Sequence, residues 1–265
     1  MEQAHGSTAD MSLLVAQGLT VSIAGIPVCH ALDLVIEAGE RWCLLGRNGA
    51  GKTTLLHTLA GLHRPDSGSL SLAGEDLSGI ANKTRARQIG LLPQDHTDAF
   101  PATALETVLT GRHPWLGALQ WEGTDDYRIA RNALATVDLA DMEARSVDTL
   151  SGGERRRLGI ATLLAQDPQL LLLDEPANHL DIHQQVRMLD LVRQQAVSDS
   201  KALCVVMHDL NLATRCCDRF LLLFGDGESA QGDATAVLTR ENLQRLYQHP
   251  LHRIEGPTGT VWIPE

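Results

Sequence analysis

The feature that most constrains the fold of this chain is a glycine-rich loop, 46-GRNGAGKT-53, which fits the pattern G-x-x-x-x-G-K-[ST]. An apolar run, 42-WCLL-45, precedes it, and a segment with helical spacing, 52–61, follows it. This order lets backbone N–H groups close around phosphate oxygens at a helix start, where the helix dipole favours negative charge. Average residue usage produces the four fixed positions by chance in on the order of one chain in a hundred of this length. The loop therefore predicts nucleotide binding.

Within this loop, two side chains are expected to have separate tasks. Lys52 is placed to reach the β- and γ-phosphates, and Thr53 to hold Mg²⁺ through its hydroxyl. The expected nucleotide-binding residues are Gly46, Arg47, Asn48, Gly49, Ala50, Gly51, Lys52, Thr53 and Thr54. A chance glycine turn is the alternative, and the strand and helix around the loop make it rarer still.

Further apolar runs predict the fold class. The segments 170-LLLL-173 and 202-ALCVVM-207 lack polar alternation, which is typical of strands covered on both faces in a parallel sheet. Helical patterns lie between the strands, so we expect an α/β fold. Residues 95–166 show helical patterns without a convincing strand, and we interpret them as a helical insert. The core then comprises 12–94 and 167–265, behind a polar, disordered tail at 1–11.

Composition limits the partners. The 265 residues carry 22 Lys and Arg against 33 Asp and Glu, a formal charge of −11, which argues against nucleic acid. We interpret the basic run Arg155-Arg156-Arg157 as a solvated helix face. The five cysteines form no disulfide or metal pattern, and this suits a reducing compartment. No apolar run is long enough to span a membrane, so any membrane role is expected to be that of a peripheral subunit.

Polar residues follow the ends of three strands. Asp174 and Glu175 end the leucine run, and because side chains alternate along a strand they diverge. Asp174 suits the outer shell of Mg²⁺, whereas Glu175 can polarise an attacking water. The alternative to a catalytic role is that the two carboxylates only begin a solvated loop. His208 follows 203-LCVVM-207 and is expected near the γ-phosphate, while Asp209 is interpreted as a helix N-cap. Gln94, after 89-IGLLP-93, can reach Mg²⁺ or water, although on its own it reads as a turn residue.

A second glycine motif, 150-LSGGERRR-157, raises a separate question. Ser151 and Glu154 have the spacing of a capping box, which begins a helix. A capping box does not require Gly152 and Gly153. Without side chains, their N–H groups can approach a phosphate, and the helix dipole points the same way.

In this order the motifs resemble the ATP-binding subunit of an ABC transporter. They are the Walker A loop 46-GRNGAGKT-53, a Q-loop with Gln94, the signature 150-LSGGE-154, the Walker B end 170-LLLLDE-175, the D-loop 178-NHLD-181 and the switch histidine His208. The resemblance covers nearly all of residues 12–240. It implies one ABC ATPase domain, 12–265, with a RecA-like P-loop NTPase core and an inserted helical subdomain, which uses ATP and Mg²⁺ to drive membrane partners.

The resemblance also implies a head-to-tail homodimer with ATP between the phosphate loop of one copy and the signature of the other. By this resemblance, Glu175 activates water, His208 holds the γ-phosphate and Asp181 belongs to the D-loop. The residues that contact ATP of the other copy are Ser151, Gly152, Gly153 and Glu154. The residues that bind the metal ion are Thr53, Gln94 and Asp174. Gln94 would couple nucleotide state to the helical subdomain, whose surface near 95–121 docks the permease.

Within the family, stretches such as 107-TVLTGRHPW-115 and 208-HDLNLATRCCDR-219 are similar to subunits that power import of iron-siderophores, heme or cobalamin. The implied partners are polytopic permease subunits and an extracytoplasmic substrate-binding protein, with this subunit peripheral on the cytoplasmic face of the inner (cell) membrane. The alternative is a non-transport ABC-type ATPase. Those proteins usually carry two cassettes, or coiled-coil or basic inserts, which this chain lacks.

Two details stay open at this point. Ile23 stands where the family usually has an aromatic residue against adenine, so we expect loose purine selectivity and comparable hydrolysis of GTP. Trp115 and Trp121 are either core residues or docking anchors, and the core is the safer prediction for an insert of this size.

Overall fold

The structure is a computed structural model that describes residues 12–94, 101–178, 180–198, 201–256 and 259–265. The tail at 1–11, expected to be disordered, lies outside the described residues, and so does the segment 95–100 of the helical insert.

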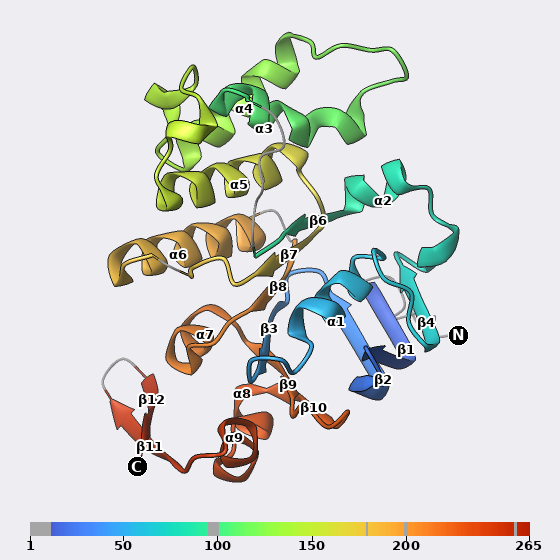
Figure 1. The fold of residues 1–265 in the computed structure, drawn as a ribbon, viewed down its shortest axis with the longest axis vertical. Helices are drawn as coiled ribbons and strands as arrows, with labels where there is room; N and C mark the ends of the chain where they lie inside the picture. The colour runs from blue at the N-terminus through green and yellow to red at the C-terminus, as the bar shows by residue number, and fades with distance from the viewer. Residues whose placement is uncertain (1–11, 95–100, 179, 199–200, 257–258) are drawn as a thin grey trace, which may run out of the picture.

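A six-stranded sheet forms the centre of the molecule, in the order β10-β9-β3-β8-β7-β6 (Figure 1). Neighbouring strands run parallel, except that β10 is antiparallel to β9. The strands are β3 (Arg41–Gly46), β6 (Ile89–Leu92), β7 (Leu170–Asp174), β8 (Ala202–Val206), β9 (Arg219–Leu223) and β10 (Ser229–Asp233). The apolar runs therefore form the predicted parallel sheet, and every residue of β7 and β8 is buried.

A smaller antiparallel sheet lies beside the central one, in the order β2-β1-β4-β5. Its strands are β1 (Ser12–Ile23), β2 (Ile26–Glu37), β4 (Ser67–Leu72) and β5 (Glu75–Asp76). Helix α1 (Lys52–Leu59) packs with both sheets, because Leu55, Leu56 and Leu59 share one apolar core with Leu14 of β1 and Leu44 of β3. This core holds the phosphate-loop helix against the centre of the molecule.

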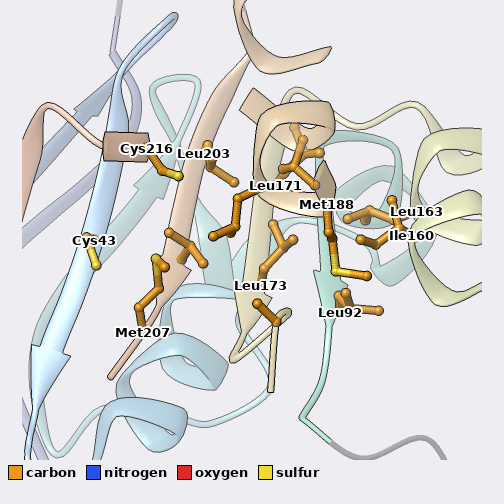
Figure 2. Close-up of a cluster of buried hydrophobic side chains, with 14 of the residues drawn as sticks. Cys43, Leu92, Ile160, Leu163, Leu171, Leu173, Met188, Leu203, Met207 and Cys216 are labelled. Carbon is orange, nitrogen blue, oxygen red and sulfur yellow. The ribbon is translucent and has the colours of Figure 1, made fainter. Parts of the chain in front are cut away.

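The opposite face of the central sheet forms a second apolar core. Leu171 and Leu173 of β7 project into it. Leu203 of β8 and Met207, the residue directly after β8, join them (Figure 2). Helix α5 (Gly152–Gln166) adds Ile160 and Leu163, and α6 (Ile182–Ser198) adds Met188. All five cysteines are buried and free. The sheet is therefore covered on both faces, as the unbroken apolar runs predict.

The insert is helical where the structure describes it. It contains α3 (Ala104–Leu109), the 3₁₀ segment η3 (Thr110–Trp115), α4 (Thr124–Thr136) and α5, with short 3₁₀ turns η4 (Ala140–Met142) and η5 (Val147–Thr149). Within residues 101–166 the β-type pairing is limited to a single bridge between Thr103 and Ser146. Helices α3 to α5 gather at one end of the molecule, at the top of Figure 1.

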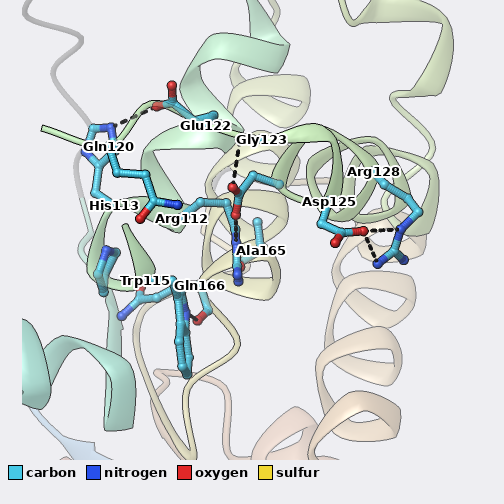
Figure 3. A network of polar contacts seen from close by, with 12 residues as sticks. Arg112, His113, Trp115, Gln120, Glu122, Gly123, Asp125, Arg128, Ala165 and Gln166 are labelled. Carbon is cyan, nitrogen blue, oxygen red and sulfur yellow. Dashed lines mark hydrogen bonds and ion pairs between the residues drawn. The ribbon is translucent and has the colours of Figure 1, made fainter. Parts of the chain in front are cut away.

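A polar seam joins the elements of the insert to one another (Figure 3). Arg112 pairs with Asp126 at 3.0 Å and donates to the Ala165 carbonyl at the end of α5. The Trp115 indole donates to the Gln166 carbonyl at 2.8 Å. Helix α2 (Asn82–Gln88) of the core joins them, because Arg87 donates to the Pro114 carbonyl. The seam thus joins η3 to both α5 and α2.

The remaining elements belong to neither of these two sheets. They are the 3₁₀ turn η2 (Leu77–Gly79), which precedes α2, and, after β8, α7 (Leu210–Cys216), α8 (Ala234–Val237), α9 (Arg240–Tyr247) and the hairpin of β11 (Leu251–Gly256) and β12 (Gly259–Pro264). Within the described ranges, no helix combines the length and the apolar character that crossing a membrane requires.

Candidate active site

Four loops that carry predicted site residues leave the central sheet at one edge. They follow β3, β8, β7 and β6, which are consecutive neighbours in the sheet. The loop after β3 is the phosphate loop, and the loop after β8 contains His208. The Asp174–Glu175 pair lies at the end of β7, and the loop after β6 contains Gln94. Ligands of parallel sheets bind at this carboxyl edge, so the topology alone brings the predicted residues together.

These loops line one cavity of 840 Å³. Its lining includes Asn48, Gly49, Gly51, Lys52, Thr53, Thr54, Gln94, Glu175, Asn178 and His208, with Ile23 at its edge. Ile23 is 48% exposed, so an apolar side chain stands beside the phosphate loop where a nucleotide base can contact it.

The phosphate loop has the backbone conformation that a cradle for anions needs. Gly49 and Gly51 have φ of +82° and +86°, in the left-handed region that favours glycine. A Cβ at Gly51 would also lie 2.4 Å from a methyl carbon of Val28. Helix α1 begins directly after Gly51, and no side chain caps its first turn. Its N-terminal N–H groups therefore face the cavity and are available to an anion.

Lys52 lies at the base of this loop and is 6% exposed. Its Nζ donates to the carbonyl oxygens of Gly46, at 2.9 Å, and Arg47, at 3.1 Å. Burial lowers the pKa of Lys52, and the nearby carboxylates of Glu175 and Asp174 oppose that shift. A buried ammonium with two carbonyl partners and two acidic neighbours can turn to a phosphate without leaving the cavity.

Asp174 is fully buried, and neither carboxylate oxygen has a hydrogen-bond partner within the described parts of the chain. Burial raises its pKa, and the nearby hydroxyl of Thr53 opposes the shift. Uncompensated buried carboxylates are costly, so the position suits a cation. No cluster of three or more His, Cys, Asp and Glu side chains that could hold a metal occurs within the described ranges. A cation here would need additional ligands, which the phosphate oxygens of a bound nucleotide can provide.

Glu175 follows Asp174 immediately after the end of β7, and it lines the cavity whereas Asp174 does not. The φ of Glu175 is +48°, a left-handed conformation that turns the chain immediately after β7. The carboxylate accepts a hydrogen bond from Gln94 Nε2 at 3.0 Å. It also contacts His208 Nε2 and the side-chain amide of Asn178. Three residues from three loops therefore fix one carboxylate in the cavity.

Asn178 did not figure among the predicted site residues. It lies three residues after Glu175, in 178-NHLD-181, and its amide reaches back to that carboxylate. The spacing was visible in the sequence, but nothing there indicates in which direction the amide points. Asp209, by contrast, is the predicted N-cap: it accepts from the N–H groups of Asn211 and Leu212 at the start of α7.

The signature and Asp181 of the D-loop do not line this cavity, although Asn178 of the same loop does. Ser151 accepts from the Glu154 N–H and the Glu154 carboxylate accepts from the Ser151 N–H, so the predicted capping box is confirmed at the start of α5. Ser151 and Gly152 are exposed, and a Cβ at Gly152 would meet nothing within 4 Å. Asp181 caps the first turn of α6 through the Gln184 N–H. None of these residues lines the cavity around Lys52.

Two predictions for the insert need correction. The basic run after the signature is not a solvated face: Arg155, Arg156 and Arg157 are all partly buried, and Arg156 binds backbone carbonyls of the core. Trp121 is 86% exposed and Trp115 is 39% exposed, so neither is a core residue. The apolar positions of α4 and α5 already fill the interior of the insert, whereas Trp115 ends η3 and Trp121 lies in the connection between η3 and α4.

Comparison with known proteins agrees with these features. The ABC transporter family matches residues 29–178. The hemin import ATP-binding protein HmuV of Nocardia farcinica is 41% identical over 94% of this chain and 88% of its own length. The ferric enterobactin transport ATP-binding protein FepC of Escherichia coli K12 is 35% identical, over 95% and 93%. The dimeric post-hydrolysis ATP-binding cassette MJ0796 with ADP and Pi superposes with a TM-score of 0.73 at 26% identity, over 83% of this chain and 98% of that one.

The match to the family extends over more than half of the chain, and the match to the first relative extends over most of both proteins. With the phosphate cradle and the Glu175 carboxylate on one cavity, this chain therefore belongs to the ABC transporter family and is one of its ATP-hydrolysing, energy-coupling subunits.

Proposed function

We propose that this chain is the ATPase of an importer for heme, and that two copies work together beneath polytopic permease subunits. The observation that supports it most is the convergence of four loops, at the ends of four neighbouring strands, on one cavity lined by a buried lysine and the Glu175 carboxylate. Heme is preferred over cobalamin or an iron-siderophore because identity to the hemin import protein of Nocardia farcinica is 41%. Identity is 36% to a cobalamin import protein and 35% to the enterobactin protein.

In this proposal the phosphates of ATP rest on the N–H groups of residues 46–54, with Lys52 turned from its carbonyl partners to the γ-phosphate. Thr53, Asp174 and Gln94 would hold Mg²⁺. The unpartnered buried oxygens of Asp174 beside the Thr53 hydroxyl fit a hard cation that prefers oxygen ligands. When bound, Mg²⁺ neutralises charge on the phosphate oxygens during phosphoryl transfer.

Glu175 is the proposed general base. Its carboxylate lies in the cavity, 8% exposed, and its position is fixed by Gln94, Asn178 and His208. A carboxylate held in this way can orient the attacking water and accept its proton. His208 would turn from Glu175 to donate to the γ-phosphate. Closing of the site thus exchanges contacts between side chains for contacts to the nucleotide.

The separation of the signature from the cavity supports a second copy as partner. Ser151, Gly152, Gly153 and Glu154 begin α5 outside the cavity, and α5 directs its N-terminal dipole outward. They would close over ATP held by the other copy, with Asp181 at the same interface. The surface near 95–121 would dock the permease, an extracytoplasmic binding protein would supply cargo, and the subunit would be peripheral on the cytoplasmic face of the membrane.

Replacing the proposed base tests the mechanism. We expect Glu175→Gln to keep ATP affinity, to lower steady-state hydrolysis about 100-fold or more, and to trap an ATP-bound dimer. Lys52→Ala is the contrasting variant, because it should lose ATP affinity as well as turnover. Turnover is measured as phosphate release and affinity by nucleotide titration. Hydrolysis at the wild-type rate in Glu175→Gln would exclude Glu175 as the base.

Cargo is tested in the complete transporter. We expect the ATPase of the complex, reconstituted with its permease and binding protein, to rise when the binding protein is loaded with heme. The same ATPase measurement is repeated under identical conditions with the binding protein loaded with cobalamin or with a ferric siderophore. Stimulation by one of those arms alone would replace heme as cargo while leaving the ATPase assignment unchanged.

A further inference from the structure

Arg156 makes an unusual set of contacts for a residue in a basic run. Its guanidinium donates to five backbone carbonyl oxygens: Pro93 at 2.7 Å, Gln94 at 3.0 Å, Asp174 at 2.5 Å, Glu175 at 2.8 Å and Pro176 at 3.0 Å. A guanidinium has five N–H groups in a fixed planar fork. Each group therefore has a carbonyl acceptor, and the side chain is partly buried.

The five carbonyls belong to two loops of the candidate active site. Two come from the turn after β6, which carries Gln94. The other three come from Asp174, at the end of β7, and from Glu175 and Pro176 in the turn after it. The side chains of the same two residues meet in the cavity, where Gln94 Nε2 donates to the Glu175 carboxylate at 3.0 Å. Arg156 therefore holds the backbones of two residues whose side chains contact each other on the cavity side.

Arg156 itself belongs to α5, five residues after Ser151. The far end of α5 is held by the polar seam, through Arg112 to Ala165 and Trp115 to Gln166. The signature helix is thus joined to η3 at its C-terminal end and to the active-site loops near its N-terminal end. A displacement of the signature acts directly on the loops that carry Gln94 and Glu175.

We propose that Arg156 is a positioning residue that couples the signature helix to the Gln94–Glu175 pair. This proposal rests on the proposed role of Glu175 as general base. A lysine cannot take its place, because an ammonium has three donors on one nitrogen and cannot reach five carbonyls spread over two loops. A glutamine has two donors and a shorter side chain, so it can bridge the loops only in part.

Kinetics supply the first test, with Arg156→Lys and Arg156→Gln as variants. We expect kcat to fall about 10- to 100-fold, because a small misplacement of a catalytic group has effects of that size. ATP affinity should stay within about twofold, since no Arg156 bond reaches residues 48–54. Arg128→Gln is the matched control: Arg128 is an exposed arginine of the same insert, paired only locally with Asp125, and its loss should leave both values unchanged.

A distance measurement separates positioning from general loss of stability. Spin labels at Asn132→Cys on α4 and Glu75→Cys on β5 would report how the insert sits on the core, and the five native cysteines are buried. We expect one narrow distance in the protein with Arg156 and a broadened distribution in Arg156→Lys, with an unchanged circular dichroism spectrum. If Arg156→Gln fails to fold, Arg156→Lys carries the test.

A wild-type kcat, or a fall in kcat matched by an equal loss of ATP affinity with an unchanged label distance, would overturn the proposal. The Glu175→Gln variant keeps this test independent of the base assignment. Full hydrolysis in Glu175→Gln would remove the role of Glu175, whereas an unbroadened distance in both Arg156 variants would remove the role of Arg156.

Discussion

Asp174 combines complete burial with two carboxylate oxygens that lack a hydrogen-bond partner among the described residues. Burial raises its pKa, so the folded protein holds this proton more tightly than the unfolded chain does. The ionised carboxylate therefore destabilises the nucleotide-free protein at neutral pH. This destabilisation disappears as the pH falls through the raised pKa of the folded state.

We therefore expect Asp174→Asn to stabilise the nucleotide-free protein by about 1 kcal/mol near pH 7, because the amide removes a buried charge. The gain should shrink as the pH is lowered, and MgATP should stabilise the variant less than the wild-type protein. Urea unfolding at several pH values, with and without MgATP, measures both effects. Asp125→Asn, at an exposed site, is the control. A variant less stable than wild type at pH 7 would contradict the argument.

At the scale of single residues, the sequence predicts contacts that depend on local geometry. Lys52 follows a glycine loop, and Glu175 follows the last residue of a buried strand, so the loop and the direction of the strand place both residues at the site. Arg156 is different, because its acceptors are backbone carbonyls about 20 and 60 positions away in the chain. Carbonyl oxygens have no sequence signature, so no pattern in the sequence could distinguish Arg156 from a solvated arginine.

Among the elements, the 3₁₀ segment η3 depends most on one side chain. The guanidinium groups of Arg87 and Arg112 lie over the Trp115 ring, 5.1 Å and 5.5 Å from its centroid, and the ring N–H donates to the Gln166 carbonyl. Figure 3 shows Trp115 beside Arg112 and Gln166. Two cation–π contacts and one hydrogen bond fasten η3 between the core and the end of α5.

We expect Trp115→Ala to lower the free energy of unfolding by about 2 kcal/mol, the sum of these contacts. Trp121→Ala is the matched control: that residue is 86% exposed, and its loss should change stability by less than about 0.5 kcal/mol. Denaturant titration of both variants measures the difference. Equal effects of the two substitutions would show that the seam adds no stability.

Elements differ in how well the sequence predicts them, because their burial differs. Strands β7 and β8 are buried at every position, so their sequences are continuous apolar runs, and these runs predict the strands. In β11, Leu251 is buried and the next five residues are exposed, and this pattern does not differ from a polar loop. The C-terminal hairpin therefore carries no apolar period from which it could be predicted.

At the scale of the whole molecule, the cavity is incomplete without a second copy in the proposed mechanism. The order of strands brings four loops to one edge, whereas the signature begins a helix of the insert outside the cavity. The sequence predicted both parts, because each has a local motif. Their separation depends on how the insert sits on the core, and this arrangement involves contacts such as the Trp115 seam that no local pattern encodes.

Ser151→Asp tests whether the signature acts on the ATP of a second copy. Aspartate caps a helix as well as serine does, so α5 should keep its start, but the new negative charge would oppose the γ-phosphate of the partner copy. We expect the isolated subunit to bind ATP normally and its ATP-driven dimerisation to fall about tenfold or more. Dimerisation is measured in the Glu175→Gln background, by light scattering on a sizing column. Thr103→Asp is the matched control, since Thr103 and Glu106 form the same capping box at α3. Loss of ATP binding in the Ser151→Asp monomer would mean that the signature acts within its own chain, and the homodimer mechanism would then fall.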